Sequence, residues 1–419
     1  MWGALCGLSI DVLLTRRSAL RRSGQNPPER DEGTENAQSR FEKVAGRSYM
    51  RRAAQLCRAP MVVAIMRILL DTYCWVDGTP SGISIMRSLG TEWSRAFPAD
   101  EVTLRVPKND VSYVKADVQR LQLGVDVDHY PRWARYHALA VATIAVRRRE
   151  YDAVLTHNFC PPFSGAPRVV LVHDALFVTN PEWFTKKELF YLRGVRPSLR
   201  RATTVLATSQ SEAARIGSVW PELRGRIAQV GLSAPTTMVN ARAKRPSAWN
   251  EAVPFVLTVG RLNVRKNLGR LIEAFARVAQ QDLTRHLVVV GEKDGKYSPG
   301  AIPDHVTSRI HFLGHVSDDE LRWLYENCDL FVFPSLDEGF GLPLLEADML
   351  GAATIASDIP VFRELEVAAA YFDPRSVDEM AAAILLGLRS ATTAGAARLT
   401  WQDVVRNIRR TVEKGLVLK

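Results

Sequence analysis

Short apolar runs alternate with longer stretches of helical periodicity from Met66 onward. In the first half, runs rich in Val, Leu and Ile recur at 68–72, 102–106, 153–157, 169–174, 204–209 and 228–232. Runs of this length predict buried β-strands, and the segments between them predict helices. This alternation indicates α/β structure with parallel sheets.

The second half repeats the alternation, with strand-like runs at 255–261, 286–292, 311–314, 330–335, 354–358 and 371–374. Its helices carry terminal signals. Ser317 with Glu320 and Ser376 with Glu379 fit capping boxes. Pro343 and Gly351 fit the start and the position after the end of one short helix.

Residues 236–252 lack either period and predict a linker. We therefore expect two doubly wound halves, 66–235 and 253–400, followed by a terminal amphipathic helix over 401–419. Ligands bind at the carboxyl ends of the strands in such sheets, so the cleft between the halves is the expected site.

The first residues differ in composition. Residues 1–60 hold 11 Lys and Arg against 6 Asp and Glu, which is half of the net charge of +10. The segment is polar and aperiodic, and it has too few apolar groups to offset its ordering entropy. We interpret 1–65 as a disordered basic extension, or as sequence preceding a native start at Met61 or Met66.

Length and composition are those of a globular, enzyme-sized chain: 419 residues, 47% hydrophobic and 24% charged. The five cysteines are scattered without a C-x-x-C pair, which predicts neither a zinc site nor a disulfide framework. The apolar stretches near the start are too short or too charged for a bilayer span. A cytoplasmic protein is the expectation.

The stretch EGFGLPLLEA, 338–347, joins two acids to a glycine-rich turn and a helix start. Gly339 and Gly341 allow close backbone approach to a ligand, and the N–H groups of the turn and helix suit a diphosphate. Glu338 and Glu346 are better placed to accept hydrogen bonds from sugar or ribose hydroxyls. An isolated pair of acids at this spacing is more often a surface feature.

Basic residues follow the first strand of the second half, in VGRLNVRKNL. Arg261 and Lys266 are expected at the mouth of the same cleft, where two cations would neutralise a leaving diphosphate. Arg265 and Arg270 are expected to be ordinary surface charges.

Two further candidates lie in the first half. His173, with Asp174, ends a buried strand, where an imidazole can bind substrate or move a proton, although a lone histidine is more often structural. Gly78 and Gly82 lie in DGTPSGIS, a loop suited to backbone contact with phosphate or substrate, which is weak evidence by itself.

These blocks, in this order, resemble the retaining glycosyltransferases of family 4. The similar segments are HDALFVTNPEWF, VGRLNVRKNLGRLIEAFA, HFLGHVSDDELRWLY and FVFPSLDEGFGLPLLEADMLGAATIASDIPVFREL. The resemblance covers the chain from about Met66 and implies the GT-B fold, two Rossmann-like domains facing each other across a cleft.

The resemblance also implies residue roles. It places Glu338 near the reacting carbon of the donor sugar, Glu346 on the ribose, and Arg261 with Lys266 on the diphosphate. It places the backbone of Gly339, Phe340, Gly341 and Leu342 on phosphate and sugar, His173 near the transferred sugar, and Gly82, by an approximate match, in the first loop.

The implied reaction transfers a hexosyl group from a nucleotide-diphosphate sugar to a glycan or lipid-linked glycan, with retention and without a metal or other cofactor. The segment PEWF, 181–184, resembles mannosyl- and rhamnosyltransferases, which favours mannose and GDP-mannose. Basic clusters at 146–150 and 193–201 fit an anionic membrane surface, and hence a peripheral protein of the inner membrane face.

Other hypotheses remain open. Asp126 and Asp128 form a D-x-D, on one face of a short strand, that would hold a metal in transferases of the other major fold. A sugar-nucleotide epimerase, a phosphorylase and a non-catalytic nucleotide-sugar-binding partner share the fold signals. Nucleic-acid binding rests on charge alone, without aromatic platforms or a domain signature, and is not expected.

Overall fold

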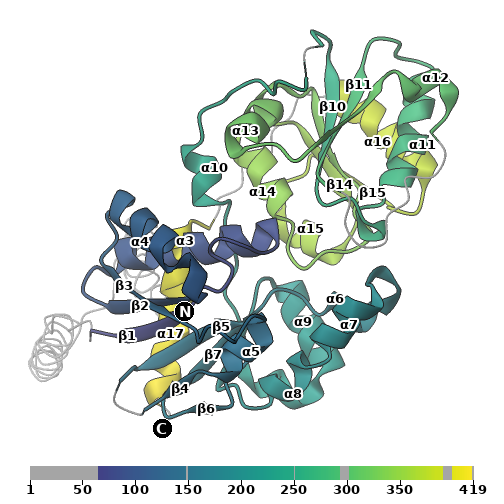
Figure 1. The fold of residues 1–419 in the computed structure, drawn as a ribbon. Helices are drawn as coiled ribbons and strands as arrows, with labels where there is room; N and C mark the ends of the chain where they lie inside the picture. Colours follow the sequence, from purple (N-terminus) through teal and green to yellow (C-terminus); the bar gives the residue numbers. More distant parts are fainter. Residues whose placement is uncertain (1–64, 148–149, 250, 293–301, 390–398, 418–419) are drawn as a thin grey trace, which may run out of the picture. The chain divides into compact units, whose positions relative to one another are not determined.

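The computed structural model describes residues 65–147, 150–249, 251–292, 302–389 and 399–417. The extension expected at 1–65 lies outside the described residues, apart from Ile65. Residues 65–419 form one compact unit that holds two parallel sheets and their helices (Figure 1). The prediction of α/β structure in two halves is confirmed.

The first sheet has seven strands in the order β3-β2-β1-β5-β7-β8-β9. Every neighbouring pair is parallel; Leu69 of β1, for example, pairs with Thr103 of β2 and Val154 of β5. The strands are β1 (Arg67–Asp71), β2 (Glu101–Val106), β3 (Val125–His129), β5 (Ala153–His157), β7 (Arg168–Val172), β8 (Thr204–Ala207) and β9 (Ile227–Gln229). A separate pair is formed by β4 (Ala145–Val146) and β6 (Phe163–Ser164).

Helices connect these strands. They are α3 (Pro80–Ala96), α4 (Val111–Arg120), α5 (His137–Ala142), α6 (Leu176–Thr179), α7 (Lys186–Leu192), α8 (Val195–Leu199) and α9 (Gln210–Val219), with short 3₁₀ helices at Lys108–Asp110, Pro181–Trp183 and Pro221–Arg226. The central strands are buried on both faces, as expected when helices cover a parallel sheet.

The second sheet has six parallel strands in the order β12-β11-β10-β13-β14-β15. They are β10 (Phe255–Val259), β11 (His286–Val290), β12 (Ile310–Gly314), β13 (Leu330–Phe333), β14 (Thr354–Ser357) and β15 (Ala370–Phe372). Its helices are α11 (Leu268–Val278), α12 (Asp304–Thr307), α13 (Asp318–Asn327), α14 (Leu342–Met349), α15 (Pro360–Leu365) and α16 (Val377–Arg389), with a 3₁₀ turn at Val264–Lys266.

Local sequence signals explain several helix ends. Ser317 and Glu320 form a reciprocal capping box at the start of α13, as predicted. At α16 only half of the expected box forms: Ser376 accepts from the Glu379 N–H, whereas the Glu379 carboxylate accepts from the Asp373 N–H. Gly351 follows α14 with φ +77°, a left-handed conformation that glycine adopts without strain.

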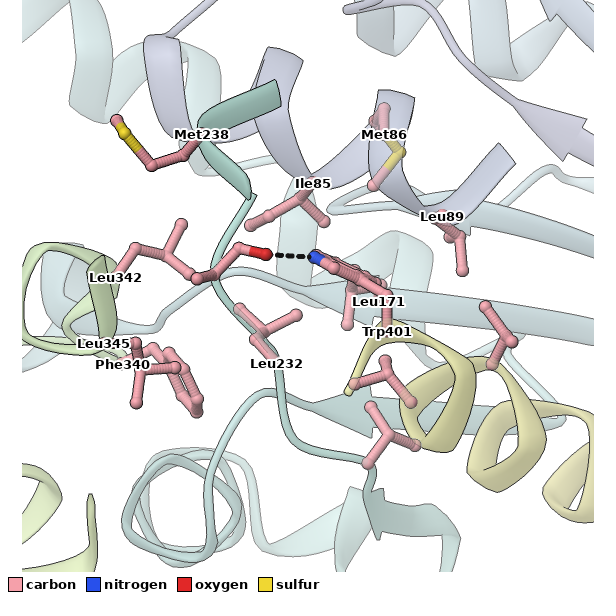
Figure 2. Close-up of a cluster of buried hydrophobic side chains, with 14 of the residues drawn as sticks. Ile85, Met86, Leu89, Leu171, Leu232, Met238, Phe340, Leu342, Leu345 and Trp401 are labelled. Atoms are coloured by element: carbon pink, nitrogen blue, oxygen red, sulfur yellow. Dashed lines mark hydrogen bonds between the residues drawn. The ribbon is translucent and has the colours of Figure 1, made fainter. Parts of the chain in front are cut away.

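The connection between the halves contains a helix that the sequence did not predict, α10 (Thr236–Asn240). The terminal helix α17 (Trp401–Val417) packs against α3, so the chain returns to the first sheet at its end (Figure 1). Arg409 forms a buried ion pair with Asp100 beside α3, and Trp401 donates its indole N–H to the Ala234 carbonyl at 2.8 Å (Figure 2).

A continuous apolar cluster joins the two halves. Ile85, Met86 and Leu89 of α3 and Leu171 of β7 contribute from the first half. Phe340, Leu342 and Leu345, at the start of α14, contribute from the second, with Leu232 and Met238 between them (Figure 2). Phe340 and Leu342 follow Glu338 closely in the chain, so their burial in this cluster anchors the loop that carries Glu338.

Candidate active site

A cavity of about 710 Å³ opens between the carboxyl ends of the two sheets. Loops that follow strands of both sheets line it. They contribute Gly78–Ser81 after β1, His173 and Asp174 after β7, Gly260 and Arg261 after β10, Gly291 and Glu292 after β11, and Glu338–Leu342 after β13. This is the position where parallel α/β sheets bind ligands.

Glu338 lies at the centre of a charged cluster in this cavity. Its side chain binds Arg265 through Oε2, and Lys266 Nζ lies 2.6 Å from Oε1. Ser335 Oγ donates to the same Oε1 at 2.8 Å. Burial alone would raise the pKa of Glu338, which is 6% exposed, but the charges of Arg265 and Lys266 lower it below its ordinary value. The group is therefore a carboxylate that accepts hydrogen bonds.

Arg265 is the residue that sequence reasoning missed. It was expected to be a surface charge, yet it lines the cavity and pairs with Glu338. The cause is the 3₁₀ turn before Asn267: that residue adopts φ +57° and its side-chain amide donates to the Pro334 and Pro374 carbonyls. The turn is thereby fixed beside the loop after β13, and both adjacent cations reach Glu338.

Arg261 and Lys266, the expected pair, also line the cavity. Burial lowers the pKa of Lys266 despite the opposing effect of Glu338, and its Nζ lies 4.4 Å from the centroid of the Phe333 ring. The cluster therefore has three cationic side chains rather than the two expected from the sequence.

Glu346 lies in α14, lines the same cavity and is 8% exposed. The Tyr325 hydroxyl donates to its Oε2 at 3.0 Å. Burial raises the pKa of Glu346 to about 7, in spite of that hydrogen bond. The two acids of the stretch thus have opposite electrostatic environments, one paired with cations and one with a phenol.

The loop from Gly339 to Leu342 needs its glycines. A side chain at Gly339 would place its Cβ 2.7 Å from the Asp174 Cβ and 2.8 Å from the His173 carbonyl oxygen. The Gly339 carbonyl accepts from the hydroxyls of Thr208 and Ser209 at 3.1 and 3.2 Å. Gly341 has φ +107°, so a larger residue would be strained.

His173 lines the cavity from the first half. Its Nε2 lies 3.3 Å from Nδ1 of His157, and burial lowers its pKa to about 4, so the ring is neutral near pH 7. Gly82 is not among the lining residues. Its N–H donates to Thr79 Oγ1 at 3.1 Å as part of the α3 cap, and the preceding residues Gly78–Ser81 line the cavity instead.

Asp126 and Asp128 lie on β3, at the edge of the first sheet, and do not line the cavity. Asp126 is exposed and Asp128 is bound by Arg105. Within the described ranges, the one group of side chains close enough to share a metal is Asp71, His137 and His157. These residues are distant in sequence, so no spacing pattern could have revealed them.

Comparison with known proteins places the chain among glycosyltransferases. Residues 239–395 match the family described as glycosyl transferases group 1. Over 280 residues the chain is 27% identical to the O-antigen chain mannosyltransferase B of Escherichia coli, covering 61% of this chain and 73% of the relative. It is 28% identical over 230 residues to the serotype-specific mannosyltransferase WbdA of Escherichia coli. That match covers 51% of this chain but 28% of the relative's length.

Solved structures agree on the fold. A sucrose-phosphate synthase from Thermosynechococcus elongatus superposes with a TM-score of 0.54 at 18% identity, covering 83% of this chain and 94% of the other. Within the described residues, no helix is both long and apolar enough to cross a membrane. Residues 239–395, in the second half of the chain, thus match the glycosyl transferases group 1 family, and the chain has the GT-B-like fold of its structural neighbours.

Proposed function

We propose that the protein transfers a hexosyl group, with mannose favoured, from a nucleotide-diphosphate sugar to a glycan or lipid-linked glycan. Transfer would retain the anomeric configuration and need no metal. GDP-mannose is the proposed donor. Two matched relatives are named as mannosyltransferases, one of them for an O-antigen chain, which supports the sugar and the acceptor class.

The observation that carries this proposal is the binding of Arg265 and Lys266 to Glu338 inside the cavity. The two cations can bind an anionic group of a ligand. The carboxylate beside them can accept a hydrogen bond from a hydroxyl next to that anionic group. A diphosphate would bind the cations, and Glu338 would accept a hydrogen bond from the neighbouring sugar. In this arrangement the cationic side chains, rather than a metal ion, would neutralise the charge of the diphosphate.

The proposed roles are those that the family resemblance implies, and the position of these residues at the cavity supports them. Arg261, Arg265 and Lys266 would stabilise the negative charge that grows on the leaving diphosphate. The backbone of Gly339–Leu342 and the start of α14 would bind phosphate and sugar, and Glu346 would accept from the ribose hydroxyls. His173 would contact the transferred sugar from the opposite wall.

In the proposed step, the bond between the anomeric carbon and the diphosphate oxygen breaks as the acceptor hydroxyl approaches from the same face of the sugar. The acceptor oxygen forms the new bond to that carbon. Its proton passes to the departing diphosphate. Because the pKa of Glu338 is lowered by two cations, Glu338 is suited to stabilise an electron-poor sugar and not to donate a proton.

The direct test is donor cleavage with water as acceptor. Protein is incubated separately with GDP-mannose, UDP-glucose and dTDP-rhamnose, and proton NMR follows both the released nucleotide and the first sugar anomer formed. We expect cleavage of GDP-mannose with initial release of the α-anomer, unchanged by chelator. Cleavage of another donor alone would reject GDP-mannose. Initial release of β-mannose from GDP-mannose would reject retention, and loss of cleavage with chelator would reject metal independence.

A peripheral position at an anionic membrane is the proposed location. The surface of α7 and α8 combines exposed Phe190 with exposed arginines at 193, 196, 200 and 201, and we call it the α7–α8 face. Basic side chains with an exposed aromatic ring suit anionic headgroups. The second predicted cluster, 146–150, includes residues outside the described ranges.

A further inference from the structure

Behind His173, away from the cavity, lies a buried polar network that the proposed transfer does not use. His157, 3% exposed, ends β5, and Asp71, fully buried, ends β1. The strands β1, β5 and β7 are neighbours in the first sheet (Figure 1). Their ends bring Asp71, His157 and His173 together. His137, at the start of α5, completes the group.

Asp71 is held as a carboxylate. Burial alone would raise its pKa, but its interactions with His137 and His157 lower it below the ordinary value. Its Oδ1 accepts from the Tyr130 hydroxyl at 2.7 Å and from the Tyr73 N–H at 3.2 Å. Its Oδ2 lies 2.7 Å from His137 Nε2 and 3.7 Å from His157 Nε2.

The position of His157 determines which of its nitrogens carries the proton. Its Nε2 is buried, has no hydrogen-bond partner among the described residues and lies 3.7 Å from a carboxylate oxygen of Asp71. A lone pair at Nε2 would be repelled by that negative charge in a buried site, whereas an N–H would be attracted. His157 is therefore protonated at Nε2, and its Nδ1 is an acceptor.

This acceptor determines the state of His173 in turn. With Nδ1 of His157 accepting, the Nε2 of His173, 3.3 Å away, must donate. The remaining nitrogen of His173, Nδ1, then carries a lone pair, and it makes no hydrogen bond to another described residue. A neutral ring can carry only one N–H.

We infer that Asp71 and His157 are positioning residues that hold His173 as the tautomer protonated at Nε2, leaving Nδ1 as a hydrogen-bond acceptor for the ligand. A ligand group at Nδ1 must then donate. A sugar hydroxyl does so, and a diphosphate oxygen does not. The identification of the donating group as a sugar hydroxyl rests on the proposed function. The tautomer of His173 does not, because it is a property of the free protein.

A shared metal ion is the other use of Asp71, His137 and His157. The rings of His137 and His157 are stacked, with centroids 4.0 Å apart and planes inclined by 17°. A histidine nitrogen binds a metal in the plane of its ring, and two nearly parallel planes do not meet beside the carboxylate. The network is therefore a hydrogen-bonded chain rather than a metal centre.

The test is the tautomer of His173 in protein labelled with ¹⁵N-histidine, read at pH 7 from two-bond proton–nitrogen correlation spectra. A His173→Gln variant assigns the His173 signals. We expect protonation at Nε2 in the native protein, and no change on adding chelator or zinc. Protonation at Nδ1, or a zinc-dependent change in the His157 signals, would overturn the inference.

Asp71→Asn provides the second measurement. Oδ1 accepts from two donors at 2.7 and 3.2 Å, whereas Oδ2 accepts one longer bond, from the His157 backbone N–H at 3.5 Å. We therefore expect the amide oxygen on the Oδ1 side and the NH₂ group toward His137 and His157. His157 Nε2 then has to accept, and the tautomers of His157 and His173 reverse. We expect protonation of His173 at Nδ1 and a fall in kcat for GDP-mannose cleavage that exceeds the change in KM. An unchanged His173 tautomer would overturn the inference.

If Asp71→Asn does not fold, His157→Phe keeps a stacked ring beside His137 but removes the acceptor nitrogen. His173 is then expected to populate both tautomers, and retention of the single native tautomer would count against the inference. The matched control is His311→Gln. It breaks a second histidine pair, His286 Nδ1 to His311 Nε2 at 2.8 Å in the other sheet, and it should leave His173 unchanged.

Discussion

Lys266 Nζ lies 2.6 Å from Oε1 of Glu338, a carboxylate whose other oxygen is bound by Arg265. In the ligand-free protein the acid therefore neutralises the cations that we assign to the donor diphosphate. Each partner fixes the other in place. The negative charge of Glu338 offsets the repulsion between the two cations, and the cations keep Glu338 ionised in a buried site.

Glu338→Gln should separate binding from turnover. The amide keeps the size of the side chain but removes the negative charge, so a diphosphate meets two unneutralised cations and GDP should bind more tightly. Stabilisation of the electron-poor sugar is lost, and kcat should fall by about 10²-fold or more. Calorimetry with GDP and donor-cleavage rates measure the two effects.

The control for Glu338→Gln is Glu326→Gln, which removes another ion-paired acid, 2.7 Å from Arg322 on the surface of α13. It should change neither quantity. Turnover of Glu338→Gln within a factor of two of the native rate would remove this residue from the mechanism.

Arg265→Ala should weaken GDP binding more than Arg277→Ala. A charge-assisted hydrogen bond contributes about 1.5–3 kcal/mol, which corresponds to a roughly 10- to 100-fold increase in Kd. Arg277 lies on α11, pairs with Asp378 at the surface and does not line the cavity, so it serves as the matched control. Equal Kd values for the two variants would show that Arg265 does not contact the diphosphate.

Glu346 should make stability depend on pH. Its pKa is raised from an ordinary value near 4.5 to about 7, so the folded state binds a proton that the unfolded state releases between these values. Its contribution to stability is fully present below about pH 4.5 and declines as pH rises to about 7. The full decline is ~3 kcal/mol.

Urea unfolding of the native protein and Glu346→Gln between pH 4.5 and 8 measures this effect as a difference. The difference is necessary because other groups titrate in the same range. Burial also raises the pKa of Glu212, to about 8, with the same sign, whereas the lowered pKa of His173 has the opposite sign. Parallel stability curves for the two proteins would contradict the raised pKa.

Gly339→Ala should impair both stability and turnover. The new methyl group would overlap Asp174 and the His173 carbonyl, and moving the loop away would break its bonds with Thr208 and Ser209. Overpacking of this kind costs about 1–3 kcal/mol. Gly225→Ala is the control, since its Cβ would meet nothing within 4 Å and its φ is not positive. Unfolding midpoints and GDP-mannose cleavage compare them.

Reversing charge on the α7–α8 face should reduce membrane binding. Arg193→Glu/Arg200→Glu reverses two exposed cations of this face, of which Arg193 lies over the Phe190 ring. Arg406→Glu/Arg410→Glu makes the same change in net charge on α17. In sedimentation with vesicles of phosphatidylglycerol and phosphatidylcholine at low salt, only the first variant should bind less than the native protein. Equal losses of binding in the two variants would indicate attraction by net charge rather than by the α7–α8 face. Absence of vesicle binding by the native protein would reject the proposed membrane location.

Much of the fold could be predicted because apolar runs fix buried strands in both halves. The runs at 153–157 and 255–261 coincide with β5 and β10 because central strands are apolar on both faces. The edge strand β3 carries Asp126 and Asp128 and gives a weaker pattern. The helix α10 was missed because it is five residues long.

The sequence could predict those features of the candidate site that are formed by residues close together in the chain. Gly341 and the start of α14 are adjacent in the chain, so a turn leading into a helix could be inferred from the amino-acid sequence. Arg265 could not be told from Arg270 without the conformation of Asn267, which turns one arginine toward Glu338. Asp71 and His157 meet only because β1 and β5 are neighbours in the sheet.

The return of α17 to the first sheet has a consequence for biosynthesis. Five of its residues, Trp401, Val404, Val405, Ile408 and Val412, are buried in the apolar cluster that includes α3. The second sheet and its helices, Phe255–Arg389, are therefore inserted within the first domain. On the ribosome, the inserted domain has all its strands before the first domain receives its last helix. The first domain therefore cannot complete its packing around α3 until α17 has been translated.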